Sequence, residues 1–126
     1  MDEKAPDVDL LSMTSEVTDR AVLVHAVGEV DHLTAPQLAA ELGRAGLDAS
    51  STRPVVLDMT SVSFMTSAGL AVLVEHHRGR RAHHALRIVV GGSPVGQSLR
   101  RTGLHQFLST YDTLAEALAD GPGRSS

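Results

Sequence analysis

The chain has 126 residues, which is enough for one domain with a hydrophobic core and too few for two. Hydrophobic residues make up 42% of it, which excludes overall disorder, while the aromatic share of 2% requires an aliphatic core and removes the stacking surfaces of single-stranded nucleic-acid binders. A formal net charge of -4 argues against binding duplexes through phosphates, and the lack of cysteine excludes disulfides and thiolate metal sites.

The two ends of the chain are polar. Residues 1–9 are acidic and lack the apolar run of a signal peptide, and no apolar run in the chain approaches the ~20 residues that cross a bilayer. We therefore expect a cytoplasmic protein that binds neither membrane nor nucleic acid. Residues 1–8 and 121–126 are expected to be flexible tails around one domain at residues 9–120.

The first third of the domain predicts a hairpin and a helix. Residues 10–17 alternate weakly and a valine-rich strand is predicted at 21–27, so the two form an antiparallel pair, followed by a loop at 28–32. Thr34 and Gln37 have the spacing of a capping box. The apolar residues that follow recur at helical spacing, which predicts an amphipathic helix lying on a sheet. These apolar positions are Ala35, Leu38, Ala39, Leu42, Ala45 and Ala49.

The central stretch predicts a buried strand, a short connection and a helix. Residues 55–59 are a short apolar run, which is typical of a strand covered on both faces. Ser67 is expected to cap the following helix, which runs to about Arg81. Ala68 and Val72 are expected beside Ser67, on the side away from the core. The core side should carry Leu70, Leu73, Val74 and His77.

The last third alternates strands and helices. A strand is predicted at 86–90, then a helix capped by Ser93 that stops at Gly103. A last strand is expected at 107–111, and Thr113 opens a final short helix with a second capping-box spacing. The alternation implies parallel strands after the first hairpin. The sequence therefore predicts a single α/β domain with a mixed sheet of about five strands and about four helices.

Ser67 has three interpretations. It can serve only as a helix cap, for which serine is a preferred residue. It can accept a phosphate, because a helix start offers unpaired N–H groups and the positive end of the dipole. It can be a nucleophile, since Gly69 fits a nucleophile elbow, but Met65 stands where the preceding glycine is needed. A hydrolase would also need a base and an oxyanion hole, so this interpretation is favoured least.

Three other motifs are better explained by structural roles or partner contacts than by catalysis or metal or phosphate binding. The histidine pairs 76–77 and 83–84 are neighbours on a helix and do not face one another, so a basic helix end is favoured over a metal site. Residues 91–94, Gly-Gly-Ser-Pro, lack the lysine of a phosphate loop and indicate a turn with a cap. Glu29 and Asp31 indicate an acidic edge that can contact a basic partner rather than an acid–base pair. We expect no cofactor, no metal and no catalytic residue.

Two segments resemble the anti-sigma-factor antagonists of the STAS domain family. Residues 28–35, Gly-Glu-Val-Asp-His-Leu-Thr-Ala, are similar to that family's Gly-Glu-Leu-Asp segment and the helix start after it. Residues 63–70, Ser-Phe-Met-Thr-Ser-Ala-Gly-Leu, are similar to its phosphorylation loop. Residues 93–104 resemble its third helix, and the similarity extends over about residues 10–119.

The resemblance implies a regulatory function. Ser67 stands at the serine that is phosphorylated by an anti-sigma factor with ATP-dependent serine kinase activity. The unphosphorylated antagonist would bind that anti-sigma factor and free a sigma factor, and a metal-dependent serine phosphatase would reset it. Asp31 matches an acidic loop residue of the same interface. Thr66 stands where the family usually has aspartate, which removes a negative charge beside Ser67 and makes Thr66 a second candidate acceptor.

The resemblance also implies a surface for the partner. We expect a monomer or weak homodimer. An alternative is a STAS module that is never phosphorylated and acts as an adaptor in a larger signalling assembly. The residues expected to bind the partner are Glu29, Asp31, His32, Thr66, Ser67, Ala68, Gly69 and Val72.

Overall fold

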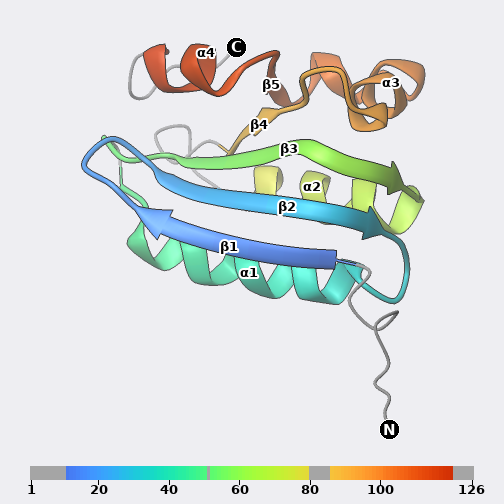
Figure 1. The fold of residues 1–126 in the computed structure, drawn as a ribbon, viewed down its shortest axis with the longest axis horizontal. Helices are drawn as coiled ribbons and strands as arrows, with labels where there is room; N and C mark the ends of the chain where they lie inside the picture. The colour runs from blue at the N-terminus through green and yellow to red at the C-terminus, as the bar shows by residue number, and fades with distance from the viewer. Residues whose placement is uncertain (1–10, 51, 80–85, 121–126) are drawn as a thin grey trace, which may run out of the picture.

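The computed structural model describes residues 11–50, 52–79 and 86–120. Within these segments one sheet has the strand order β1-β2-β3-β4-β5 (Figure 1). The first pair is antiparallel and the other three are parallel, which confirms the predicted mixed sheet and single α/β domain. The strands are β1 (Leu11–Val17), β2 (Val22–Val30), β3 (Val55–Met65), β4 (Leu86–Val89) and β5 (Ser109–Tyr111).

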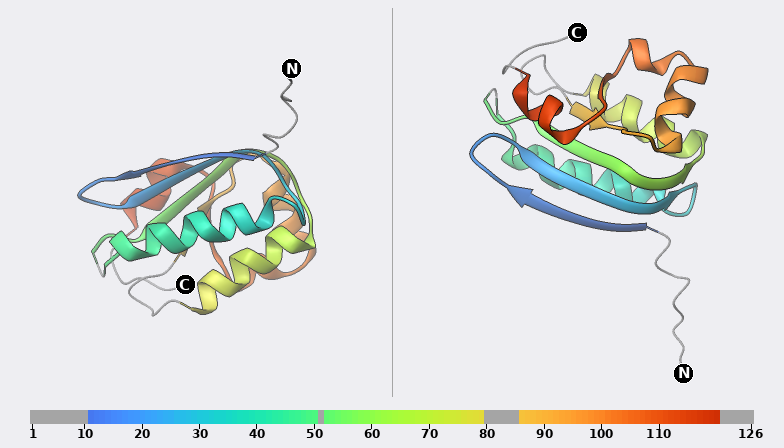
Figure 2. Two further views of the ribbon diagram at one scale, coloured as in Figure 1. Left: turned by 90° about the horizontal axis from the view of Figure 1, so that it is seen from below. Right: turned by 45° about the horizontal axis from the view of Figure 1, so that its top comes forward.

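The helices cover the two faces of the sheet unequally. Figure 2 shows α1 and α2 side by side under one face, and α3 adds Val95 and Leu99 to the same core. On the other face, Ala117 of α4 packs against Val56 and Val89. The core is aliphatic, as the composition requires. The helices are α1 (Ala35–Asp48), α2 (Ser67–Arg78), α3 (Pro94–Arg101) and α4 (Leu114–Ala119).

Strand β3 is longer than the predicted strand at 55–59, and β2 continues through residues 28–30 of the predicted loop. The register of β2 with β3 shifts twice, and each shift places an extra β3 residue in the ladder. The buried residues of this part of β3 are therefore spaced by three: Met59, Val62 and Met65. This spacing breaks the alternation of a strand, which explains why the sequence predicted a connection.

Two of the four predicted helix caps, Ser93 and Thr113, make the expected hydrogen bond from the side-chain oxygen to the helix. Ser93 accepts a hydrogen bond from the N–H two residues later, and Thr113 accepts one from the N–H three residues later. The capping box of Thr34 and Gln37 is wrong, because Thr34 makes no side-chain capping bond to α1. Gln37 Nε2 instead donates to the carbonyl of Leu11, at 2.9 Å. This side chain ties α1 to the edge strand rather than to its own first turn.

Two element ends differ from the prediction. Helix α2 ends at Arg78 rather than near residue 81, with Gly79 in the capping position. Strand β5 begins at Ser109 rather than at 107, because a short 3-10 helix (Leu104–Gln106) precedes it. Among the described segments, none of the helices combines the length and the hydropathy that crossing a bilayer requires.

Candidate functional site

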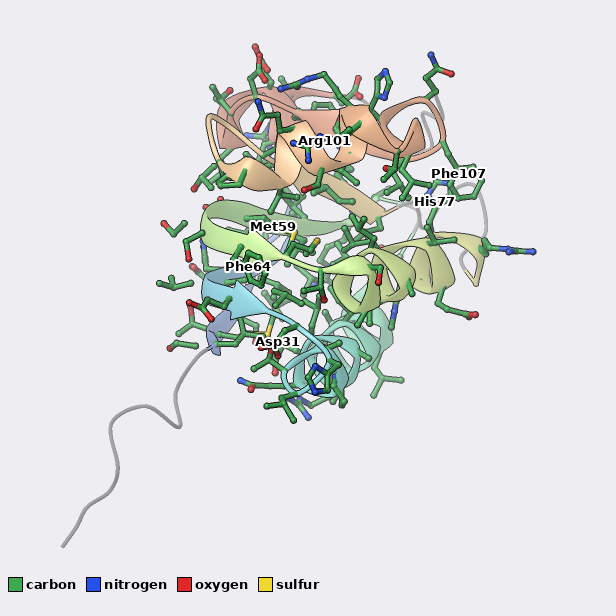
Figure 3. The ribbon with its side chains drawn as sticks, turned by 90° about the vertical axis from the view of Figure 1, so that its right-hand side faces the viewer. Asp31, Met59, Phe64, His77, Arg101 and Phe107 are labelled. Atoms are coloured by element: carbon green, nitrogen blue, oxygen red, sulfur yellow. The ribbon has the colours of Figure 1, made fainter. Side chains whose placement is uncertain are left out.

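The candidate site lies where β2 and β3 end side by side. The last residues paired between these strands are Val30 and Met65, and the N–H of Thr66 donates to the carbonyl of Val30 at 2.9 Å. Beyond this point β2 leads into a turn and β3 leads directly into α2. The two segments that resemble the STAS family are therefore brought together at one end of the sheet, where Figure 3 shows Asp31 and Phe64.

Gly69 allows the first turn of α2 to approach the strand ends. A Cβ at this position would lie 2.7 Å from Cγ1 of Val30 and 2.8 Å from Cγ of Met65, closer than side-chain carbons can pack. Gly69 is itself buried. Its inclusion in the expected partner surface is therefore corrected: it positions the start of α2 and does not contact solvent.

Ser67 is the first residue of α2 and its side chain is exposed. The prediction that Ser67 is the N-cap is off by one residue, because Thr66 occupies that position with an extended backbone. Thr66 makes no side-chain capping bond, in contrast to the caps of α3 and α4. The first N–H groups of α2 thus lack a side-chain acceptor, and the positive end of the helix dipole lies beside the Ser67 hydroxyl.

Thr66 differs from Ser67 in the accessibility of its hydroxyl. Its Oγ1 is buried and has no hydrogen-bond partner among the described residues. A kinase must reach the oxygen that it modifies, so this geometry argues against Thr66 as a second acceptor. The two neighbouring hydroxyls are distinguished by burial rather than by residue type.

Asp31 organises the turn after β2. Its Oδ1 accepts hydrogen bonds from the N–H groups of Leu33, at 2.9 Å, and Thr34, at 3.1 Å. The hydroxyl of Thr34 donates to the carbonyl of Glu29 at 2.9 Å and closes the turn. The hydrogen bond from Thr34, more than the one from Leu33 and the nearby His32, lowers the pKa of Asp31 and so stabilises its negative charge.

The solvent face of α2 is not the one that the sequence predicted. Ala68 and Val72, expected beside Ser67 on an open face, are half-buried and pack against the main core. The exposed residues of the helix are Ser67, Ala71, Glu75 and Arg78. Their spacing from Ser67 is four, eight and eleven residues, which places them on one stripe of a helix. Helical spacing counted from Ser67 would have identified this stripe from the sequence.

An exposed aromatic residue lies close to Ser67 in the chain. Phe64 is half exposed, at 50%, and pairs across the sheet with Glu29 of β2, so both side chains point to the face opposite α1 and α2. Val27, two residues before Glu29, is 52% exposed on the same face. Sequence reasoning missed Phe64 and Val27 as surface residues, because the two register shifts in β3 hide which residues face outward. Apolar and acidic side chains thus share this face of the sheet, and Phe64 lies three residues before Ser67 in the chain.

The histidines of the described segments do not assemble a catalytic or metal centre with Ser67. His76 Nδ1 lies 3.2 Å from the carbonyl of Val72, and the His77 ring packs edge-on against Phe107 with centroids 4.6 Å apart. Burial lowers the pKa of His77. No group of three histidine, aspartate or glutamate side chains suited to a metal occurs in the described part of the chain. The pair at 83–84 lies outside the described residues.

Comparison with known proteins gives a consistent result. Residues 12–117 match the STAS domain family. The chain is 27% identical over 115 residues to the anti-sigma-F factor antagonist RsfA of Mycobacterium tuberculosis, covering 90% of each chain. The crystal structure of an anti-sigma factor antagonist from Mycobacterium paratuberculosis is similar with a TM-score of 0.80 and 28% identity, over 92% of this chain and 96% of that one. Unphosphorylated SpoIIAA shares the fold, with a TM-score of 0.59 and 21% identity over 83% of this chain and 92% of its own.

Proposed function

The chain belongs to the STAS domain family, and we propose that it is an anti-sigma factor antagonist whose binding is switched by phosphorylation of Ser67. Without phosphate it binds an anti-sigma factor that is also a serine kinase, and the sigma factor is freed. With phosphate it releases that partner, and a metal-dependent serine phosphatase resets it. The chain is the substrate of these enzymes in the cytoplasm and not an enzyme itself.

One observation supports the switch above all others: an exposed Ser67 hydroxyl on the first residue of a helix whose start is firmly packed. A phosphate adds about -1.5 to -2 charges at pH 7. The N–H groups and the dipole at the start of α2 favour such an anion. Phosphorylation therefore changes the fold little, and its effect falls on the partner.

The surface around Ser67 makes the added charge effective. Asp31 is ionised, and Glu75 lies on the same exposed stripe of α2 as Ser67. In a contact that fits a neutral Ser67 hydroxyl, a phosphate adds bulk and a charge that must lose its water, and neither Asp31 nor Glu75 can neutralise that charge. A penalty of ~1.4 kcal/mol already weakens binding tenfold, and two or three such contributions make a switch.

We assign the acceptor to Ser67 and not to Thr66. The buried Oγ1 of Thr66 supports this assignment. Thr66 also takes the place of the aspartate that usually precedes the serine in anti-sigma-factor antagonists, so Ser67 lacks this neighbouring negative charge. A kinase that reads this negative charge would phosphorylate Ser67 slowly, and one that relies on the wider surface would not be affected.

The experiment combines phosphorylation with binding. The purified chain is incubated with candidate anti-sigma kinases and ATP, and the modified residue is located by mass spectrometry. The wild type and Thr66→Ala are expected to gain one phosphate, and Ser67→Ala none. Ser67→Ala should bind the kinase with or without ATP, whereas Ser67→Asp should bind poorly. A kinase that binds the chain without adding phosphate would favour the adaptor alternative.

A further inference from the structure

One face of the sheet is left uncovered by the described helices over much of β1, β2 and β3. Helices α1, α2 and α3 contribute to the core on the opposite face, and α4 covers this face only around Ala21, Val56 and Val89. Figure 1 is viewed from the uncovered side, with β1 and β2 in front of α1 and α2. The uncovered area includes Phe64, three residues before Ser67 in the chain, and therefore continues the candidate site.

The alternation of side chains along β2 decides which of them lie on this face. The even-numbered side chains of β2 lie in the main core, so the odd-numbered ones point away from α1 and α2. The register extends this assignment to the neighbouring strands, because Glu16 of β1 pairs with residue 23 of β2, and Asp58 and Phe64 of β3 pair with residues 25 and 29. We call this surface the open sheet face, and it is defined by these residues: Glu16, His25, Val27, Glu29, Asp58 and Phe64.

The open sheet face combines exposed apolar side chains with acidic ones. Phe64 is 50% exposed and Val27 is 52% exposed. The carboxylates of Glu16 and Glu29 make no ion pair with any described residue, and Asp58 is the third acid of the face. Neither arginine nor lysine is among the residues that define the face, so its charge is negative.

These charges decide which kind of molecule fits the open sheet face. A second copy of the chain would bring two negative faces together, and a nucleic acid would bring its phosphates to the carboxylates, so both are repelled. A protein surface that carries an apolar side chain beside lysine or arginine complements the face. The apolar group buries Phe64 and Val27, and the positive charges neutralise Glu16 and Glu29.

We propose that the partner bound at Ser67 extends over the open sheet face and contacts it with basic residues beside an apolar side chain. This inference rests on the proposed function, which supplies the partner. Glu16 pairs with residue 23 of β2, six residues before Glu29, which corresponds to about 20 Å along the strand and lies within the width of an ordinary protein interface. Phe64 is the member of the face nearest to Ser67 in the chain, so the apolar contact of the partner, rather than its basic contacts, adjoins the phosphorylation site.

Charge reversal at Glu16 tests the proposal far from the phosphorylation site. The affinity of the unphosphorylated chain for the anti-sigma kinase that modifies Ser67 is measured by calorimetry without ATP, at low and at high salt. Glu16→Lys should weaken binding at least about fivefold, because a basic group of the partner then meets a like charge, and the loss should shrink as salt rises. Asp48→Lys makes the same change of charge at an exposed position of α1 and should alter the affinity less than about twofold. Equal effects of the two substitutions would overturn the proposal.

Methyl NMR locates the contact without any substitution. Addition of the same kinase should shift the methyl signals of Val27 and leave those of Leu47, which is 85% exposed on α1, in place. The methyl group of Ala71, on the exposed stripe of Ser67, reports binding at the phosphorylation site itself. A shift at Ala71 without one at Val27 would overturn this inference and leave the proposed function intact. No shift at either position would overturn both.

Discussion

The N–H of Thr66 donates to the carbonyl of Val30 at 2.9 Å, which fastens the start of α2 to the end of β2. The residue after Val30 is Asp31, whose turn is closed by its own hydrogen bonds, and the residue after Thr66 is Ser67. Two segments far apart in the sequence are thus joined at the ends of β2 and β3. The proposed switch requires this connection, because a phosphate acts on the partner only if the chain does not rearrange around it.

Gly69→Ala should destabilise the packing of the start of α2 against the ends of β2 and β3. The added Cβ meets Val30 and Met65 at under 3 Å, so the free energy of unfolding should fall by about 1–3 kcal/mol. Gly43→Ala is the control, because a Cβ there has no atom within 4 Å and the position lies inside α1. The control should gain up to about 1 kcal/mol. Urea unfolding measures both, and equal changes of the same sign would show that the close approach is unimportant.

Asp31→Ala should destabilise the chain in a pH-dependent way. The pKa of Asp31 is lowered in the folded state, so its contribution is present above the unfolded value of about 3.9 and is lost as pH falls through the folded value. Wild type and variant should differ in urea midpoint at pH 7 and converge as the pH falls below the lowered pKa of the folded state. Asp31→Asn keeps the Oδ1 acceptor and should lie between them at pH 7. A gap that is unchanged in acid would show that the charge contributes nothing.

His77 should also make the free energy of unfolding depend on pH, but here the cause is burial of the ring rather than hydrogen bonding. Burial lowers its pKa in the folded state, so below the unfolded value of about 6.5 the unfolded chain binds a proton that the folded chain resists. Stability should therefore decline from pH 7 to pH 5, and His77→Phe, which keeps a ring against Phe107, should decline less. Urea midpoints across this range make the comparison. Parallel curves for the two proteins would exclude His77 as a source of the decline.

Phe64→Ala should weaken binding of the partner and leave the stability of the fold nearly unchanged. Phe64 is half exposed near Ser67, and aromatic side chains often dominate binding energy, so a loss of at least about tenfold in affinity is expected. Phe107→Ala is the matched control, because Phe107 is 45% exposed but contacts His77 at the other end of α2. Affinity for the kinase that modifies Ser67 is the measurement. An equal loss of affinity in both variants would show that the sheet face carrying Phe64 is not part of the interface.

The spacing of apolar residues predicted the order of the elements, because most helices and strands keep a single helical or strand spacing along their length. In α1 the buried residues Ala35, Leu38, Leu42 and Ala45 are the ones that helical spacing indicates. The bulged end of β3 could not be predicted, since its buried residues are spaced by three and the shifts arise from pairing with β2. The outward direction of the Phe64 side chain follows from those register shifts, so the sequence did not predict it either.

The structure brings the two predicted segments together, but the sequence did not assign their residues to separate structural roles. Thr66 and Ser67 are both suitable caps, and only the backbone of the folded chain shows which one precedes the helix. Gly69 looks like part of a surface motif in the sequence, whereas it is required by contacts with Val30 and Met65, residues of two different strands. Contacts between distant segments decide these roles, and local patterns carry no trace of them.

The central claim is tested most directly by comparing two forms of one protein. The chain is prepared with and without phosphate on Ser67, and the affinity of each form for the same anti-sigma kinase is measured by calorimetry in the absence of ATP. The account predicts that phosphate weakens binding at least about tenfold while the circular dichroism spectrum and the urea midpoint stay nearly unchanged. Equal affinities of the two forms would contradict it.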